Sequence, residues 1–129
     1  MTLETDELEI ARAVLEALGA ITVNDGVQFS SRDALECLTI IRWESDGDAA
    51  VKNLVDINAK EGHPSVGLMQ LIPSTFAQFA LPGHDQDITD PVSNIIAGVR
   101  YALKRYGGLR HVPGIAKLAA ADQGVYVGY

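Results

Sequence analysis

The sequence predicts an α+β fold that is mostly helical, with a small irregular or β lobe, in a single domain over residues 1–129. Apolar residues recur at helical spacing in stretches that begin near residues 4, 31 and 91. Between residues 47 and 67, Asp, Asn, Gly and Pro follow one another closely, which favours irregular backbone with at most a short strand pair. Hydrophobic residues make up 47% of the chain and charged residues 21%, which indicates a globular protein large enough for one core.

The first helix is expected from about residue 4 to residue 18, with Gly19 stopping it. Its apolar side is predicted to contain Leu8, Ala11, Leu15 and Leu18. Residues 20–30 alternate weakly around the turn signal Asn24-Asp25-Gly26, which predicts a loop or a small hairpin.

A second helix is expected to begin at Ser30-Ser31-Arg32-Asp33, where Ser and Asp offer a cap, and to run to about Trp43 or Glu44 before Gly47 ends it. Its buried stripe is predicted to contain Ala34, Leu35, Leu38 and Ile41, with Ile40 beside them. Cys37 lies among these residues and is interpreted as a buried apolar side chain rather than a reactive thiol. As the single cysteine, it excludes an internal disulfide.

Proline and glycine mark the remaining helices. Pro73 predicts the first turn of a helix that reaches about Ala80 and is broken by Leu81-Pro82-Gly83. Asp90-Pro91 predicts a cap and a first helical position, and Gly107-Gly108 is expected to end that long helix. A short helix around residues 115–121 follows.

The charge of the chain excludes several classes of partner. A formal net charge of −7 argues against nucleic acid, which favours basic patches, and against strong attraction to an anionic membrane.

The acidic N-terminus lacks the basic start and apolar run of a secretory signal. Residues 62–84 carry no charged Lys, Arg, Asp or Glu but hold three prolines, so we interpret them as the inner wall of a cleft rather than a membrane span. Residues 124–129 end without a cap or a charge, from which we expect the chain to be part of a longer polypeptide.

The strongest functional signal is one acid followed by an apolar wall. Glu44-Ser45 stands at the expected helix end, and Gly67-Leu68-Met69-Gln70 follows about two dozen residues later, continued by Ile72-Pro73-Ser74-Thr75-Phe76. This is the layout of an enzyme that protonates a glycosidic oxygen with one carboxyl group. The helix dipole disfavours a charged carboxylate at a helix C-terminus, and Trp43 and the apolar wall would disfavour it further, which suits an acid catalyst.

These residues resemble the soluble lytic transglycosylases, enzymes of the goose-type lysozyme clan that cut peptidoglycan. The likeness covers about Ser31 to Tyr106 and is strongest to transglycosylase domains inside phage tail tape-measure proteins, where a run similar to Asp56-Ile57-Asn58-Ala59-Lys60 also occurs. The resemblance implies a lysozyme-like fold and cleavage of the β-1,4 bond between N-acetylmuramic acid and N-acetylglucosamine, with a 1,6-anhydro product. It implies peptidoglycan glycan strands as the partner, a virion-associated location and no metal or cofactor. As an isolated domain the chain is expected to be a monomer.

The resemblance also implies roles for the residues around Glu44. Gly67 would let the backbone approach a sugar ring, Met69 would lower the polarity near the acid, and Gln70 would hydrogen-bond the glycan, with Ser65 at the edge of this wall. The structural alternative is a turn at Gly67 with apolar neighbours in the core.

Two further polar residues are matched to the family by position. Asn53 would bind the N-acetylmuramoyl sugar; the alternative is an ordinary loop residue. Tyr126 would supply an aromatic hydroxyl near the acid, although the chain has Val-Tyr-Val where the family has Ala-Tyr-Asn. Tyr129 and Tyr101 compete for this role, and Tyr101 is better interpreted as packing on the long helix.

Two rival functions remain open at this stage. Two-acid glycosidases need a second carboxylate, and Asp56 is the best candidate to position a water in a goose-type muramidase; the other candidates are Asp46, Asp48, Asp87 and Asp90. The second rival is a non-catalytic glycan-binding or structural module of a phage tail. Residues 85–90 lack the Gly and closing Glu of a calcium loop, and His63, His84 and His111 show no zinc spacing.

Overall fold

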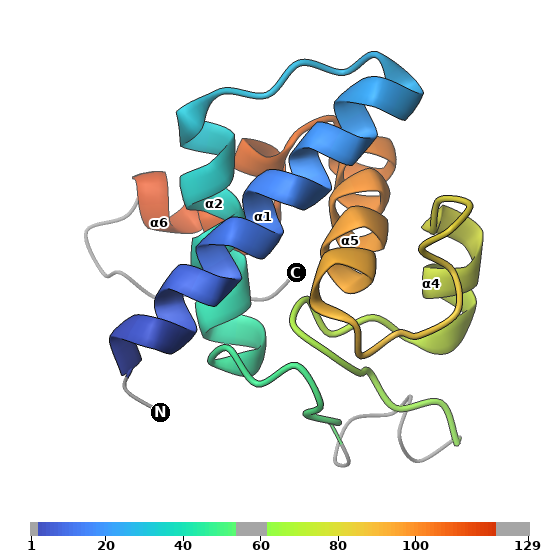
Figure 1. The fold of residues 1–129 in the computed structure, drawn as a ribbon. Helices are drawn as coiled ribbons and strands as arrows, with labels where there is room; N and C mark the ends of the chain where they lie inside the picture. Colours follow the sequence, from blue (N-terminus) through green and yellow to red (C-terminus); the bar gives the residue numbers. More distant parts are fainter. Residues whose placement is uncertain (1–2, 54–61, 121–129) are drawn as a thin grey trace.

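The computed structural model describes residues 3–53 and 62–120, which fold mostly into helices (Figure 1). In chain order these are α1 (Leu3–Asp25), α2 (Ser31–Ser45), α4 (Pro73–Phe79), α5 (Pro91–Tyr106), the 3-10 helix η1 (Leu109–His111) and α6 (Pro113–Ala120). The mostly helical character is confirmed, but the predicted small β lobe is not seen. Within the described ranges, extended pairing is limited to isolated antiparallel bridges, Lys52 with Val66 and Val66 with Leu71.

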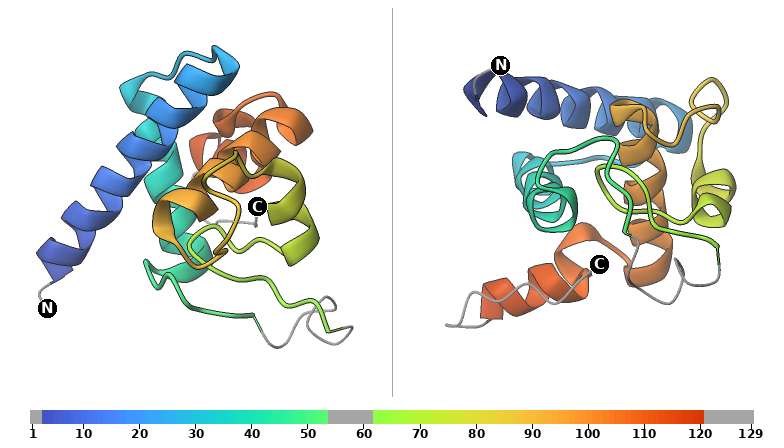
Figure 2. Two further views of the ribbon diagram at one scale, coloured as in Figure 1. Left: turned by 45° about the vertical axis from the view of Figure 1, so that its right-hand side comes forward. Right: turned by 90° about the horizontal axis from the view of Figure 1, so that it is seen from below.

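Helices α1, α2 and α5 enclose the main core, and α4 packs on α5 (Figures 1 and 2). Helix η1 contacts α2, α5 and α6, and thereby closes the core at the C-terminal end of α5. The largest fully buried side chains come from α1, α2, α5, η1 and the segment before α4: Ile21, Ile40, Ile41, Leu68, Met69, Ile95, Ile96 and Leu109. A smaller cluster of Leu71, Phe76 and Ala97 lies between α4 and α5.

Helix α1 is longer than the sequence predicts. It continues through Gly19 to Asp25, so the residues expected to form a hairpin are its last turns, and Gly26 (φ 74°) follows as the turn. Gly19 is exposed and weakens the helix by about 1 kcal/mol relative to Ala, which burial of Ile21 two residues later can offset. A single glycine is therefore a weak stop signal where the helix beyond it packs on a core.

The predicted apolar faces are partly wrong. Leu8, Leu15 and Leu35 are 66%, 62% and 63% exposed. The buried face of α1 contains the predicted Leu18 together with Ala13, Val14, Ala17 and Ile21. Helix α1 carries apolar residues around much of its circumference, and its contacts with α2 and α5 decide which of them are buried.

In α2 the buried side contains Cys37, Ile40 and Ile41. Glu36 is also buried there and pairs with Arg32 at 3.6 Å, while desolvation raises the pKa of its carboxyl. The prediction that Cys37 is a buried apolar side chain is confirmed, and burial raises the pKa of its thiol.

The helix ends that carry capping chemistry are confirmed. Ser30 and Asp33 form a reciprocal capping box at the start of α2. The Asp90 carboxylate accepts from the Ser93 backbone N–H at 2.9 Å at the start of α5. Gly107 (φ 85°) ends α5 as predicted, while α6 begins at Pro113 rather than Ile115 and η1 was not expected.

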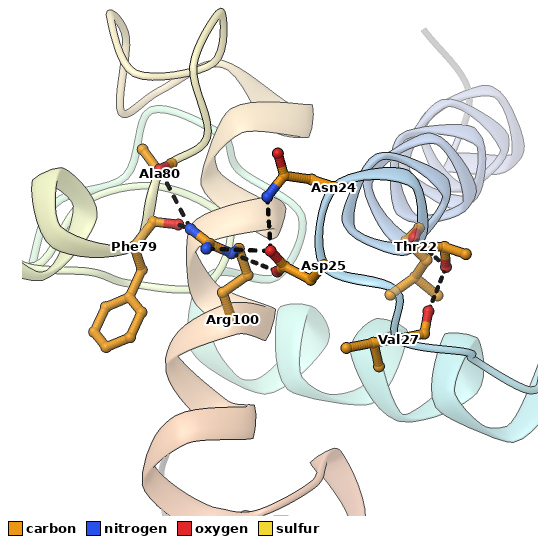
Figure 3. A network of polar contacts seen from close by, with 8 residues as sticks. Thr22, Asn24, Asp25, Val27, Phe79, Ala80 and Arg100 are labelled. Atoms are coloured by element: carbon orange, nitrogen blue, oxygen red, sulfur yellow. Dashed lines mark hydrogen bonds and ion pairs between the residues drawn. The ribbon is translucent and has the colours of Figure 1, made fainter.

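Arg100 on α5 joins the ends of two other helices (Figure 3). Its Nε donates to Asp25 Oδ2 at 2.8 Å, at the last residue of α1. Its Nη1 donates to the carbonyl oxygens of Phe79 and Ala80, which end α4. The guanidinium also lowers the pKa of the Asp25 carboxyl through this hydrogen bond. Tyr101 packs on α4 through an edge contact with Phe79, 5.7 Å between ring centres, in agreement with a packing role.

Candidate active site

Glu44 lies in the last turn of α2 and is half-buried. The next residue, Ser45, is buried, and its hydroxyl donates to the Ile41 carbonyl at 3.0 Å and accepts from the Gly47 N–H at 3.3 Å. Asp46 follows in a left-handed conformation (φ 51°), and the helix ends there. The side chain of Ser45 therefore fixes the turn that carries the acid. The indole of Trp43 is 53% exposed, so this ring lies at the surface beside it.

The chain after α2 returns to the glycine-bounded motif within a few residues. Asn53 N–H donates to the Ser65 carbonyl at 2.9 Å, and Gly67 N–H donates to the Val51 carbonyl at 3.0 Å. The structure thus brings Asn53 and Ser65, two of the predicted substrate-binding residues, into adjacent positions. Both side chains are half-buried.

Residues 67–70 form a tight turn between Val66 and Leu71. These two residues exchange backbone hydrogen bonds of 2.9 and 3.1 Å, which close the turn. Gly67 (φ 87°) and Gln70 (φ 53°) both adopt the left-handed region. Met69, predicted to lie near the acid, is fully buried in the cluster that also contains Ile41 of α2. We refer to residues 66–71 as the motif turn.

Gln70 uses its amide nitrogen inside the protein. Nε2 donates to the carbonyls of Val51 at 3.0 Å and Gly67 at 2.9 Å. An amide nitrogen has two hydrogens, and both are accounted for by these bonds. The hydrogen bond from Gln70 to a glycan stays a prediction, and only the carbonyl oxygen Oε1 is left to make it, as an acceptor.

Asn94 was missed as a residue of the site. It is fully buried on α5, its Oδ1 accepts from Met69 N–H at 2.8 Å, and its Nδ2 donates to the carbonyls of Val66 at 3.1 Å and Ile88 at 2.8 Å. The available signal was an Asn inside an otherwise apolar helical stripe, directly before Ile95. Buried amides need partners, but the sequence does not say where those partners lie.

Gly67 is required by this amide. A Cβ at Gly67 would overlap the Asn94 amide and lie 3.0 Å from the Ile88 carbonyl oxygen. The space beside Gly67 is thus filled by the protein itself on this side. Approach of its backbone to a sugar ring stays a prediction for the opposite side.

The carboxylates considered for a second acid either accept hydrogen bonds near the start of α5, lie exposed after α2, or fall outside the described residues. Asp87 accepts from the backbone N–H and hydroxyl of Thr89, which lowers the pKa of its carboxyl, and Asp90 caps α5. Asp46 and Asp48 are exposed beside the end of α2. Asp56, Tyr126 and Tyr129 lie outside the described residues.

Residues 3–53 and 62–120 bear on two other classes of function, metal binding and membrane insertion. No group of three or more His, Cys, Asp or Glu side chains is placed to hold a metal ion there. No helix in these ranges is long and apolar enough to cross a membrane.

Comparison with known proteins points to one family. A family model described as "Transglycosylase SLT domain" matches residues 28–121, a stretch that contains Glu44, the motif turn and Asn94. The chain is also 48% identical over 92 residues to the uncharacterized protein YqbO of Bacillus subtilis (strain 168). That match covers 71% of this chain and 6% of YqbO, so the chain spans a small part of its relative. No solved structure matches the chain significantly.

Proposed function

The chain belongs to the transglycosylase SLT family, and from this premise we propose that it cleaves the MurNAc-β-1,4-GlcNAc bond of peptidoglycan and leaves a 1,6-anhydroMurNAc end. Lytic transglycosylase action on peptidoglycan is the activity of the family. One observation carries the proposal for this chain. The half-buried Glu44, the one acid in the last turn of α2, is followed by a segment whose Val51 carbonyl holds both the backbone of Gly67 and the side chain of Gln70.

In the proposed reaction Glu44 begins as the neutral acid and donates its proton to the bridging glycosidic oxygen. The bond from that oxygen to the muramic C1 breaks, and the substrate's own acetamido group stabilises the positive charge that develops there. The Glu44 carboxylate then takes the proton of the C6 hydroxyl of the same sugar. The C6 oxygen bonds to C1 and closes the 1,6-anhydro ring, so Glu44 is neutral again and no water is consumed.

The surroundings of Glu44 support this role. A carboxylate in the last turn of a helix faces the negative end of the helix dipole, which favours its neutral form. Asn53, Ser65 and Gln70, with Gly67 and Tyr126, are the residues proposed to contact the glycan, while the buried Met69 supports the turn from the core. No group in the proposed reaction calls for a metal or cofactor.

The proposed location is a longer virion tail protein that carries the domain to the cell wall. The family likeness inside tape-measure proteins motivates this, and the share of YqbO that the match covers supports it, because there too a long chain holds a small matching segment. A tether of this kind raises the local concentration of the enzyme at its substrate.

The test is mass analysis of muropeptides released by the purified chain. Products with 1,6-anhydro ends are lighter by one water than the reducing ends a muramidase forms, so a majority of reducing ends would favour hydrolysis. Glu44→Gln keeps the shape of the side chain but cannot donate a proton, and we expect it to lose about 10²–10⁴-fold in rate. The exposed Glu16→Gln on α1 is the matched control and should keep full activity. A Glu44→Gln protein that retains more than about a tenth of the parent rate contradicts the assignment.

A further inference from the structure

We propose that Asn94 is the positioning residue of the site: its amide holds the motif turn at a fixed distance from the end of α2, and so sets the glycan-binding wall relative to Glu44. The inference rests on the proposed function. Asn94 is fully buried, so it acts through the turn and not on the sugar.

The amide spans the turn from both sides. Its Oδ1 accepts from Met69 N–H at 2.8 Å, and its Nδ2 donates to Val66 at 3.1 Å and Ile88 at 2.8 Å. One side chain thus fixes the entrance and the middle of the motif turn. Only an amide offers an acceptor and two donors in this geometry, because a carboxylate lacks donors and an apolar side chain lacks both.

The support beneath Asn94 is rigid. Its own N–H donates to the Asp90 carbonyl at 2.9 Å, in the first turn of α5, and the Asp90 side chain and Pro91 fix where this helix begins. On the other side, Gly67 lies against the Asn94 amide with no room for a Cβ. The position of the motif turn therefore follows from the position of α5.

The motif turn is hydrogen-bonded to the segment that follows the helix carrying Glu44. Gly67 N–H and Gln70 Nε2 both donate to the Val51 carbonyl, each at 3.0 Å. Val51 belongs to the segment that leaves the end of α2, where Ser45 orders the last turn. A continuous set of hydrogen bonds and covalent chain thus connects α5 to the helix end that carries Glu44. Displacement of a reacting group by about 1 Å can cost about 10²-fold in rate.

Asn94→Asp tests the inference with an isosteric side chain. The Asp side chain keeps an acceptor for Met69 N–H but, whether ionised or protonated, it cannot donate to the carbonyls of both Val66 and Ile88. We expect kcat/KM on soluble peptidoglycan fragments to fall at least about tenfold, mostly through KM, at a temperature where circular dichroism reports a folded protein.

The control is Ile21→Ala, which removes buried volume from α1 but leaves every hydrogen-bonding group of Asn94 and the motif turn in place. It should lower thermal stability at least as much as Asn94→Asp while kcat and KM stay within about twofold at a temperature where it is folded. If Ile21→Ala loses as much activity as Asn94→Asp, or if Asn94→Asp keeps kcat and KM, the inference is wrong. Asn94→Ser replaces Asn94→Asp if the aspartate variant does not fold.

Hydrogen exchange separates this inference from the proposed function. In the Asn94 variant the amides of Met69 and Leu71 should exchange faster than in the parent, while the amide of Ala102 on α5 is unchanged. Faster exchange in the variant, together with a parent protein that releases no muropeptides, would reject the proposed function and keep the structural coupling. Unchanged exchange at Met69 would reject the positioning role whatever the activity.

Discussion

Gly67 combines two constraints, a left-handed backbone and contact with the Asn94 amide. Gly83 has almost the same φ, 86° against 87°, but no atom within 4 Å of its would-be Cβ. We therefore expect Gly67→Ala to destabilise the fold by about 1–3 kcal/mol more than Gly83→Ala, because only the first overpacks its neighbours. Urea denaturation of both variants measures the difference. Equal losses would mean that the Asn94 amide moves aside at little cost.

The residues of the candidate site differ in how much of their placement could be predicted from the sequence. The helix end at Glu44 and the turn at Gly67 could be predicted, because a helix end and a short glycine-bounded motif are local patterns, and the roles of these residues in catalysis and binding stay predictions. Asn94 could not be predicted, because its hydrogen bonds to Met69 and Val66 join residues 25 and 28 positions apart. The hydrogen bond from Gln70 Nε2 to the Val51 carbonyl could not be predicted for the same reason, since Val51 lies 19 positions away.

At the scale of elements, the glycine inside α1 is a site for stabilisation. Gly19 is exposed, helical and has nothing within 4 Å of a would-be Cβ. Gly19→Ala should raise the free energy of unfolding by about 0.5–1 kcal/mol, because alanine loses less backbone entropy in a helix. The midpoint of urea unfolding checks this, with activity expected to stay unchanged. A lower midpoint would indicate that α1 ends or bends at Gly19 in solution.

The ion pair of Arg100 and Asp25 makes the joint between α1, α4 and α5 sensitive to pH. Folding lowers the pKa of Asp25 from its ordinary value of 3.8, so its contribution to stability is present above that value and is lost as the pH falls below it. Arg100→Met should cost about 1–3 kcal/mol at neutral pH, since two carbonyls and a carboxylate lose their donor.

Because Asp25 loses its charge in acid, we expect Arg100→Met to lower the free energy of unfolding by less in acid than at neutral pH. Unfolding of parent and variant at neutral pH and near pH 3 measures it, and Arg12→Met on the exposed side of α1 serves as the control. A cost that does not change with pH would show that the carbonyls of α4, not Asp25, account for the role of Arg100.

Element boundaries were predictable where a capping side chain or a left-handed glycine marks the helix end, as at Ser30, Asp90 and Gly107. The predicted boundary was wrong where packing decides, as at the end of α1. The predicted buried face of α1 was partly wrong for a related reason, because Leu8 and Leu15 compete with Val14 and Ile21 in periodicity alone. Which face is buried depends on where α2 and α5 lie, and local spacing does not contain that information.

At the scale of the whole molecule, the charge is unevenly distributed. Residues 91–121 hold five Lys and Arg and no Asp or Glu, so all 17 acidic residues lie elsewhere while the formal net charge is −7. Lys104, Arg105, Arg110 and Lys117 are exposed, and the part of the chain that the structure describes gives none of them an ion pair. The molecule thus has a basic end, formed by the end of α5, η1 and α6.

We expect the isolated chain to bind intact anionic walls weakly, because net repulsion opposes the approach. Activity on such walls should hold or rise as ionic strength increases toward about 0.1 M, where the screening length is about 10 Å. Co-sedimentation with walls and turbidity loss over a salt series measure both. A steep fall in binding with salt, abolished by Lys104→Gln and Arg105→Gln together, would mean that the basic end dominates over the net charge.

This separation of charge also exerts a torque on the molecule near an anionic polymer. Lys104 stands ten positions after Asn94 on α5, which places the basic end roughly 15 Å along the helix axis from the residue that holds the motif turn. A freely diffusing copy would rotate its basic end toward the wall and turn the motif turn away from it. Such a copy spends its encounters in the wrong orientation. A copy fixed in a larger particle has its approach angle imposed from outside, so attachment would supply direction as well as concentration.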